Sequence, residues 1–178
     1  NVSEKELLAV SSKAFCVIND EIEDKMRASV EKARLDGDSV GGVIECAVVG
    51  VPVGIGANIF STVEGHISSA LFGVPAVKGV EFGAGFDFAK MTGYEANDTY
   101  SISNGNVKIN KNNNGGVLGG MTTGAPIIVR AVVKPTPSIS KAQKSVNLQK
   151  MTEEELVIHG RHDPCIVPRA VPVVESAV

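Results

Sequence analysis

The stretch NNNGGVLGGMTTGAPIIVRAVVKPTPS, residues 112–138, places glycine-rich turns beside an apolar run that ends in a lysine and two prolines. The run Ile127 to Val133 is typical of a strand, and Pro135 cannot continue a sheet, so Lys134 is expected where the chain leaves it. Two glycine pairs precede the run: Gly115, Gly116, Gly119 and Gly120. Such glycines permit positive φ and close backbone approach, so that amide groups can converge on an anion.

Hydroxyl groups complete this pattern, from Thr122, Thr123, Thr136 and Ser138. Together with Lys134 they suit a phosphate. The spacing matches neither the dinucleotide-binding fingerprint nor the P-loop, whose lysine directly follows a glycine. A glycine-rich hairpin packed on a neighbouring element would have the same pattern. Spacing alone leaves both interpretations open.

Length and composition indicate one folded domain with an aliphatic core. The 178 residues are 43% hydrophobic, which excludes a disordered chain. Nineteen glycines with six Phe, two Tyr and no Trp favour β structure with many tight turns. The net charge is −3, and no basic run is interleaved with aromatic residues, so a nucleic-acid groove is not expected.

The cysteines and the apolar runs indicate a cytoplasmic protein. Cys16, Cys46 and Cys165 are an odd set without a CxxC pair, which is typical of thiols in a reducing compartment. Charges or glycines interrupt every apolar run before it could span a membrane, and the chain does not open with a signal-peptide pattern.

Two capping-box spacings predict helix starts near the beginning of the chain: Ser3 with Glu6, and Asp20 with Glu23. The second helix should stop at Gly37. Its apolar stripe is expected to pack against the protein and consists of Ile22, Met26, Val30 and Ala33.

A β-helix-β sequence follows. Val43 to Val49 and Val77 to Phe82 have strand composition, and a helix between them should open at Ser61 with Glu64 and end at Gly73. The crossover is long enough for parallel or non-adjacent antiparallel strands.

The alternating segment Tyr100 to Ile109, centred on Asn104-Gly105, predicts a β-hairpin. Its strands and those between Gly116 and Val133 are expected to extend one sheet covered by the earlier helices. The predicted fold class is therefore α+β.

The closing stretch GRHDPCIVPRAVPVVE, residues 160–175, holds a dense set of functional groups. His159, His162 and Cys165 offer three metal ligands, but a structural zinc needs four and a catalytic zinc usually draws on several elements, so no metal is predicted. Arg161 offers a planar donor fork for an anion, and Asp163 a carboxylate that could move a proton. A surface ion pair between the two is the competing interpretation.

Three motifs in this order, VKGVEFGAGF (77–86), the glycine-rich stretch and GRHDPCIVPRAVPVVE, resemble the carboxyl-terminal half of chorismate synthase. The resemblance runs from about Gly41 to the last residue, although the family protein is about twice as long. It implies a β-α-β sandwich of antiparallel sheets with helices. Residues 1–178 are thus predicted to be a single partial domain, with the amino-terminal half and the extreme carboxyl terminus missing.

The resemblance also implies a function in aromatic amino-acid biosynthesis by the shikimate pathway. The family reaction is an anti 1,4-elimination of phosphate from 5-enolpyruvylshikimate 3-phosphate to give chorismate, with reduced FMN as cofactor and homotetramers as the assembly. The family's two acid/base histidines belong to the missing half, so this fragment alone is expected to be inactive. A non-catalytic FMN- or phosphate-binding module, or an oligomerisation module, is the alternative.

Site residues follow from the same resemblance. The matching aspartate, Asp163, lies near flavin N5 in the family and is proposed to accept a proton there. Arg161 would contact both substrate and flavin, while His162 is carried only as part of its motif. The FMN contacts implied are Pro75, Ala76, Gly119, Lys134, Pro135, Thr136, Pro137, Ser138 and Arg161.

Overall fold

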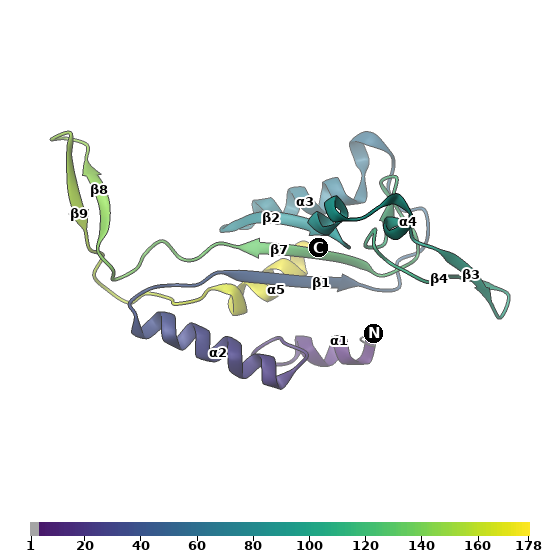
Figure 1. The fold of residues 1–178 in the computed structure, drawn as a ribbon, viewed down its shortest axis with the longest axis horizontal. Helices are drawn as coiled ribbons and strands as arrows, with labels where there is room; N and C mark the ends of the chain where they lie inside the picture. The colour runs from purple at the N-terminus through teal and green to yellow at the C-terminus, as the bar shows by residue number, and fades with distance from the viewer. Residues whose placement is uncertain (1–3) are drawn as a thin grey trace. The chain divides into compact units, whose positions relative to one another are not determined.

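The computed structural model describes residues 4–178, an α+β chain whose elements divide between two compact units (Figure 1). The first unit comprises the residues up to 42 together with 133–170, and the second comprises 43–132 with 171–178. The fold class agrees with the sequence prediction. That residues 1–178 form a single partial domain remains a prediction.

The main sheet of the second unit has the order β1-β7-β2, formed by β1 (Gly42–Val48), β2 (Val77–Phe82) and β7 (Ile127–Val133). All three strands were predicted. The strands that flank the predicted crossover are not adjacent, because β7 lies between them. β1 and β7 run in opposite directions (Figure 1). Alternate residues of β7 are buried, from Ile127 to Val133, which makes this strand the centre of the core.

The crossover helix α3 (Val63–Gly73) packs along β2 and buries Leu71 completely. It ends at Gly73 as predicted, but the predicted start at Ser61 is wrong. Ser61 closes a short 3₁₀ turn, η1 (Ile59–Ser61), and the Thr62 hydroxyl caps the helix by accepting from the Gly65 N–H at 2.9 Å.

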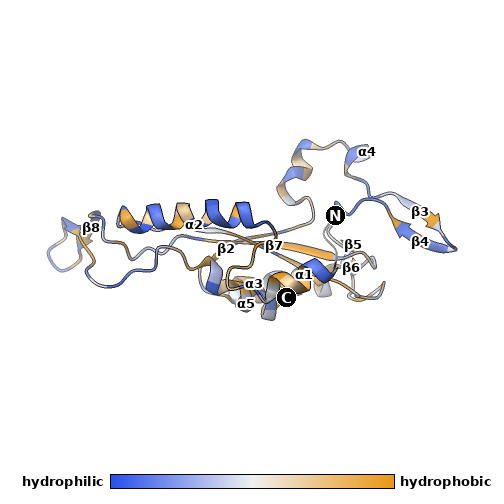
Figure 2. Cartoon of the chain, turned by 90° about the horizontal axis from the view of Figure 1, so that it is seen from below, coloured by the Kyte–Doolittle hydropathy of each residue, from blue (hydrophilic) through white to orange (hydrophobic). Residues whose placement is uncertain are grey.

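The closing helix α5 (Val167–Ala177) was not predicted and contains Pro172. Its part in the second unit buries Val174 and lies on the same face of the sheet as α3 (Figure 2). Short elements complete this unit: η2 (Gly85–Lys90), α4 (Gly93–Ala96), β5 (Val117–Leu118) and β6 (Met121–Thr122).

The predicted hairpin is confirmed as β3 (Tyr100–Ser103) and β4 (Asn106–Ile109), with Asn104 and Gly105 at φ 51° and 76°. This is the pair of positive φ angles that a two-residue turn requires. The prediction that it extends the main sheet is wrong, because β3–β4 and β5–β6 are separate two-stranded sheets. The side chains of β3 are exposed on both faces, so no apolar burial would be gained by pairing this strand with the main sheet.

In the first unit, α1 (Glu4–Ser11) is followed by α2 (Asp20–Leu35). The predicted Ser3 cap lies outside the described residues. The predicted Asp20 cap is wrong by one residue: Asn19 has extended backbone angles, and its side chain accepts from the Glu21 N–H at 2.8 Å. Beyond the helix, Gly37 has φ 64°, as expected of a terminating glycine.

The apolar stripe of α2 does not pack as predicted. Ala33 is buried, whereas Ile22 is 45% exposed and Met26 is 44% exposed. Near the start of the helix, the Arg27 guanidinium lies over the Phe15 ring, 4.5 Å from its centroid. The helix is therefore stabilised largely by its caps and local pairs.

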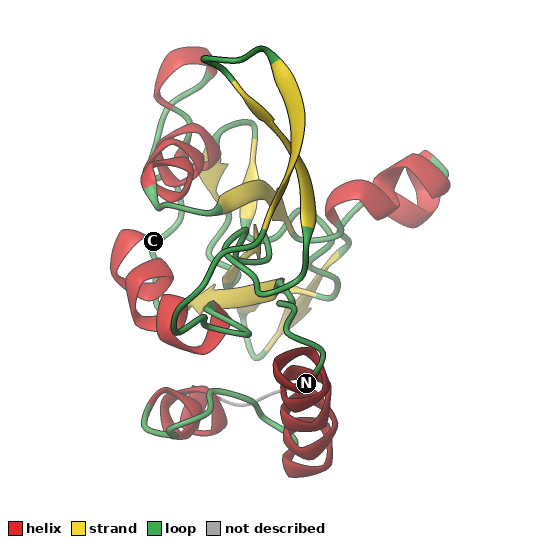
Figure 3. Ribbon diagram, turned by 90° about the vertical axis from the view of Figure 1, so that its left-hand side faces the viewer, coloured by secondary structure: helices red, strands yellow, loops and turns green. Residues whose placement is uncertain are grey.

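The first unit also contains a hairpin that the sequence analysis missed, β8 (Gln143–Asn147) and β9 (Thr152–Leu156), a twisted two-stranded ribbon (Figure 3). Asn147 organises its turn by accepting from the N–H groups of Gln149 and Lys150, both at 3.1 Å. The three cysteines are free thiols. No helix within residues 4–178 is long and apolar enough to cross a membrane.

Candidate cofactor and substrate site

The KPTPS segment, residues 134–138, leaves the end of β7 as predicted, with Lys134 directly after the last strand residue. Two features of the chain before β1 hold it in place. The Ser39 hydroxyl donates to the Thr136 carbonyl at 2.6 Å. Gly41 lies against the Val133 carbonyl, and a Cβ at this position would come within 3.0 Å of the Pro135 ring. A side chain at position 41 would therefore displace the segment.

His162 connects this segment to the closing motif. Its Nδ1 lies 3.0 Å from the Ser138 hydroxyl oxygen, and its Nε2 lies 3.0 Å from the Ile158 carbonyl oxygen. A carbonyl only accepts, so Nε2 carries a proton, and in the neutral ring Nδ1 accepts from Ser138. Two predicted stretches of the site, Lys134 to Ser138 and Arg161 to Asp163, thus meet within the first unit.

Asp163 and Arg161 do not pair with each other. The Asp163 carboxylate instead lies 2.5 Å from Nη2 of Arg169 on α5. Arg161 and Lys134 are both exposed, and within residues 4–178 neither has an acidic side chain within ion-pair distance. Two cations of the first unit are therefore available to an anionic ligand.

The Thr136 hydroxyl is a second sign of a ligand. Its oxygen is buried and has no hydrogen-bond partner among the described residues. Buried polar atoms are rarely left in this state, because an unmade hydrogen bond costs about 1–3 kcal/mol. An orphaned hydroxyl between Lys134 and Ser138 is consistent with a ligand that carries hydrogen-bond acceptors, such as a phosphate.

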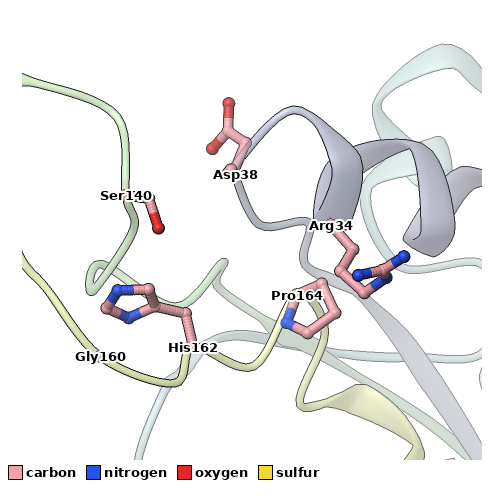
Figure 4. Close-up of a pocket in the computed structure, with 7 residues that line it drawn as sticks. Arg34, Asp38, Ser140, Gly160, His162 and Pro164 are labelled. Carbon is pink, nitrogen blue, oxygen red and sulfur yellow. The ribbon is translucent and has the colours of Figure 1, made fainter.

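A hollow of about 150 Å³ borders His162 in the first unit. It is lined by Arg34, Gly37, Asp38, Ser140, Gly160, His162 and Pro164. His162 and Ser140 lie on one side of it, and Arg34 lies beyond Pro164 (Figure 4). This volume is below the about 300–1,000 Å³ typical of cofactor pockets, so the hollow gives access to His162 without enclosing a flavin.

The acidic group of the hollow is already compensated. The Lys141 ammonium donates to the Asp38 carboxylate at 2.7 Å, and the Ser39 N–H donates to it at 2.8 Å. The hydrogen bond from Lys141, followed by that from Ser39, lowers the pKa of Asp38. Asp38 therefore links Ser39, which bonds to the KPTPS segment, to Lys141, which follows that segment in the chain.

The remaining predicted contacts lie in the second unit. Pro75 is exposed, and Ala76 before β2 has φ 72°, an uncommon conformation for a residue with a side chain. Gly119 turns between β5 and β6 at φ 60°, where a Cβ would meet open space. Backbone conformation, and not crowding, is what requires glycine at position 119.

Of the two threonines predicted to offer hydroxyls to an anion, Thr122 is used within the protein. The Thr122 hydroxyl is buried, donates to the Pro52 carbonyl at 2.6 Å and accepts from the Ile55 N–H at 2.9 Å. The Thr123 hydroxyl accepts from the Ala125 N–H at 3.4 Å. The Thr122 hydroxyl thus spends its only hydrogen within the protein, so it has none to donate to an anion.

Asp98 anchors the start of the glycine-rich stretch, a role that sequence reasoning missed. Its carboxylate accepts from the N–H groups of Asn113 and Asn114 at 2.7 and 3.1 Å, and from the Asn114 side-chain amide at 2.9 Å. Asn112 then accepts from the Gly116 N–H at 2.8 Å. The asparagine run preceding the glycines was the available signal, because such side chains organise turns.

Within residues 4–178, no three His, Cys, Asp or Glu side chains gather as a metal-ion site would require. His159 is exposed, and His162 uses both ring nitrogens in hydrogen bonds.

Comparison with known proteins identifies the family. The model of the chorismate synthase family matches residues 2–178. The chain is 51% identical over 175 residues to chorismate synthase of Thermococcus gammatolerans, covering 98% of this chain and 49% of the relative. It is 52% identical over 158 residues to that of Korarchaeum cryptofilum, covering 89% of this chain and 44% of the relative.

A crystal structure of chorismate synthase superposes with a TM-score of 0.76 at 28% identity, covering 98% of this chain and 46% of the other. The chain thus spans about half the length of the relatives it matches. On this evidence, the chain belongs to the chorismate synthase family.

Proposed function

We propose that this chain is the carboxyl-terminal part of a lyase that eliminates phosphate from 5-enolpyruvylshikimate 3-phosphate to form chorismate. The observation that carries the proposal is the family match over residues 2–178, at about 50% identity to relatives named for this activity. The reaction removes a ring hydrogen and a phosphate group without net oxidation. A site for it needs cations for the anionic substrate and a base for the proton.

The proposed cofactor is reduced FMN, which supplies electron density to the substrate transiently and recovers it. We propose that its phosphate is held by Lys134, Thr136 and Ser138. The support is the exposed Lys134 ammonium, the buried Thr136 hydroxyl without a partner among the described residues, and the Ser138 hydroxyl, whose position is fixed by His162. The adjoining prolines, Pro135 and Pro137, limit the segment to few conformations. In the second unit, the proposed contacts are Pro75, Ala76 and Gly119, supported by the positive φ of the last two.

Arg161 is proposed to bind an anionic group of the substrate, and Asp163 to take up a proton. Arg161 is exposed and has no acidic side chain within ion-pair distance in residues 4–178, so its guanidinium can donate two parallel hydrogen bonds to a carboxylate or phosphate. The Asp163 carboxylate is 41% exposed and is oriented by Arg169. We expect Asp163→Asn in a complete enzyme of the family to spare FMN binding while turnover falls. Unchanged turnover in that variant would remove the proton role.

A second candidate is a module that binds FMN without turnover. It is favoured by the observation that the chain spans about half the length of its relatives, so further catalytic groups can lie outside the matched region. We also propose a homotetrameric assembly and a cytoplasmic location, because the resemblance to the chorismate synthase family implies them. Sedimentation of the chain would test the assembly.

The deciding experiment is an anaerobic titration of the chain with reduced FMN in the presence of substrate, following flavin absorbance and released phosphate together. Phosphate release would establish the lyase activity in these residues. Binding without release would support an incomplete enzyme, which is the result expected if the family's two acid/base histidines lie outside this chain. Absence of flavin binding would contradict the proposed cofactor site.

A further inference from the structure

The hydrogen bonds of His162 fix the direction in which Ser138 can donate. With Nε2–H committed to the Ile158 carbonyl, Nδ1 of the neutral ring accepts the only hydrogen of the Ser138 hydroxyl. The Ser138 oxygen then offers lone pairs to anything else that approaches. An unprotonated phosphate oxygen also offers only lone pairs, so the two would oppose each other.

Protonation of His162 reverses this arrangement. The imidazolium donates from both nitrogens, so Nδ1–H points at the Ser138 oxygen, and the serine hydrogen becomes free to donate to a ligand. We propose that His162 is a positioning residue that sets the hydrogen-bond direction of Ser138 and takes up one proton from solvent when a phosphate-bearing flavin binds. This inference rests on the proposed function, which assigns Ser138 to the FMN phosphate.

The charges around His162 suit such a response. The titratable and charged groups on the segments around the ring are Arg34, Asp38, Lys134, Lys141, His159, Arg161, Asp163, Cys165 and Arg169. Most of them are paired: Asp38 with Lys141, Asp163 with Arg169, and Arg34 with Glu31 at 2.6 Å. Arg161, next to His162 in the chain, has no acidic side chain within ion-pair distance among the described residues.

Because Asp38 and Asp163 are already paired, a bound anion would supply the negative charge that stabilises a protonated His162 ring. Among the described residues, the acidic groups near the ring are already held by Lys141 and Arg169. A phosphate bound at Ser138 adds a negative charge beside the ring and accepts the freed serine hydrogen, so ligand binding favours the imidazolium. By linkage, the protein then binds FMN more tightly at low pH, where His162 is already charged, and more weakly as pH rises through the titration of the ring.

The FMN phosphate itself loses a proton near pH ~6, which changes affinity in the opposite sense. The test therefore compares variants at each pH. FMN affinity is measured from about pH 5.5 to about pH 8.5 for the wild-type chain, His162→Asn and Ser138→Ala. The Asn amide can donate to Ser138 at every pH. His159→Asn and Ser140→Ala serve as matched controls from the same two segments, and riboflavin serves as the probe without a phosphate.

We expect the ratio of wild-type to His162→Asn affinity for FMN to fall about tenfold across this range. In the Ser138→Ala background, wild-type His162 and His162→Asn should give the same FMN affinity at every pH. The two control variants should behave as wild type. Riboflavin affinity should be the same with and without His162. In the unmodified chain, the NMR titration of the His162 ring should move to higher pH when FMN is added and stay in place with riboflavin.

Two results would overturn the inference. One is an FMN affinity profile that is the same in the wild type and His162→Asn; the other is a His162 ring titration that FMN leaves unmoved. The second measurement uses the wild-type chain, so a folding defect in a variant cannot obscure it. Failure of FMN to bind at any pH would contradict the proposed cofactor site and this inference together, which distinguishes that failure from the first two.

Discussion

The KPTPS segment, residues 134–138, and the glycine-rich stretch, residues 112–120, are both candidate cofactor contacts, yet they are built differently. The KPTPS segment is held by side chains: Ser39 donates to its backbone, and His162 bonds to Ser138. The glycine-rich stretch is held by backbone N–H groups that converge on Asp98, and by glycines in the left-handed region.

The two segments therefore differ in role: one offers groups that can bind a ligand, and the other fixes the backbone conformation. The KPTPS segment presents an exposed ammonium and a buried hydroxyl without a partner among the described residues, which are groups that can act on a ligand. The buried hydroxyl of Thr122, which follows the glycine-rich stretch, is instead used within the protein for one donated and one accepted hydrogen bond. Substitutions in the glycine-rich stretch and its supports should therefore affect folding first, and substitutions in the KPTPS segment should affect ligand binding first.

The largest effect is expected for Gly83→Ala, which acts on the support of the glycine-rich stretch. Gly83 has φ 55°, and a Cβ there would overlap the Asn113 carbonyl and the Gly115 amide. Left-handed strain and overpacking together predict a loss of about 2–5 kcal/mol in the free energy of unfolding. Urea denaturation of the wild type and Gly83→Ala measures this loss in the free energy of unfolding.

Gly50→Ala is the matched control. Gly50 has φ 75° but no atom within 4 Å of the added Cβ, so only the conformational part of the cost, about 1–2 kcal/mol, should remain. Equal losses in the two variants would contradict the close approach described for Gly83.

Asp98→Ala should be the next most damaging substitution. It removes the acceptor of three hydrogen bonds, two of them from backbone groups, and should cost about 2–3 kcal/mol. Asp87→Ala, which breaks an exposed pair with Lys90, should shift the urea midpoint far less, because solvent screens such surface pairs. If both variants unfold at the same urea concentration, Asp98 does not anchor the stretch.

Lys134→Ala should sharpen the contrast, because it is expected to leave stability unchanged and weaken FMN binding. Loss of one charge-assisted hydrogen bond predicts about tenfold weaker binding, or about 1.4 kcal/mol. Lys144→Ala, an equally exposed lysine on β8, should bind FMN as the wild type does. FMN affinity that is unchanged by Lys134→Ala would remove the phosphate assignment.

The smallest effect concerns pH and the Asp38–Lys141 pair beside the KPTPS segment. The pKa of Asp38 is lowered by its hydrogen bond to Lys141 and then by that to Ser39. This stabilisation is fully present above the unfolded-state pKa of Asp38 and is lost as pH falls through the lower folded-state pKa.

Lys141→Met should therefore reduce the urea midpoint slightly at neutral pH and have no effect in strong acid. The exposed Lys150, which lies 3.7 Å from Glu154, provides the control substitution. A difference between wild type and Lys141→Met that grows toward low pH would contradict the sign of this account.

Sequence reasoning located the three strands of the main sheet and the β3–β4 hairpin because their signals are local. The Asn104-Gly105 turn and the apolar run of β7 need no tertiary context. Helix starts were missed by one residue, since Asn19 and Thr62 compete with neighbouring acceptors for the capping position and only backbone geometry decides. α5 was missed because Pro172 argues against a helix, and β9 because its charged sequence lacks strand alternation.

For the site, the sequence motifs indicated which segments matter but not how they are held. The bond between His162 and Ser138 joins residues 24 positions apart, and the bonds from Asp98 to Asn113 and Asn114 span 15 and 16 positions. No local pattern encodes such pairings, since they depend on how the strands and loops pack. The same holds for the hydroxyl of Thr122, which was expected to face a ligand and is instead used by the protein.

The most direct test of the central claim, a phosphate-binding KPTPS segment in a flavin site, compares FMN with riboflavin in an anaerobic titration of the chain after reduction. The account predicts that FMN binds about tenfold more tightly than riboflavin or better, and that Lys134→Ala removes most of this margin. Equal affinities for the two flavins in the wild-type chain would contradict it.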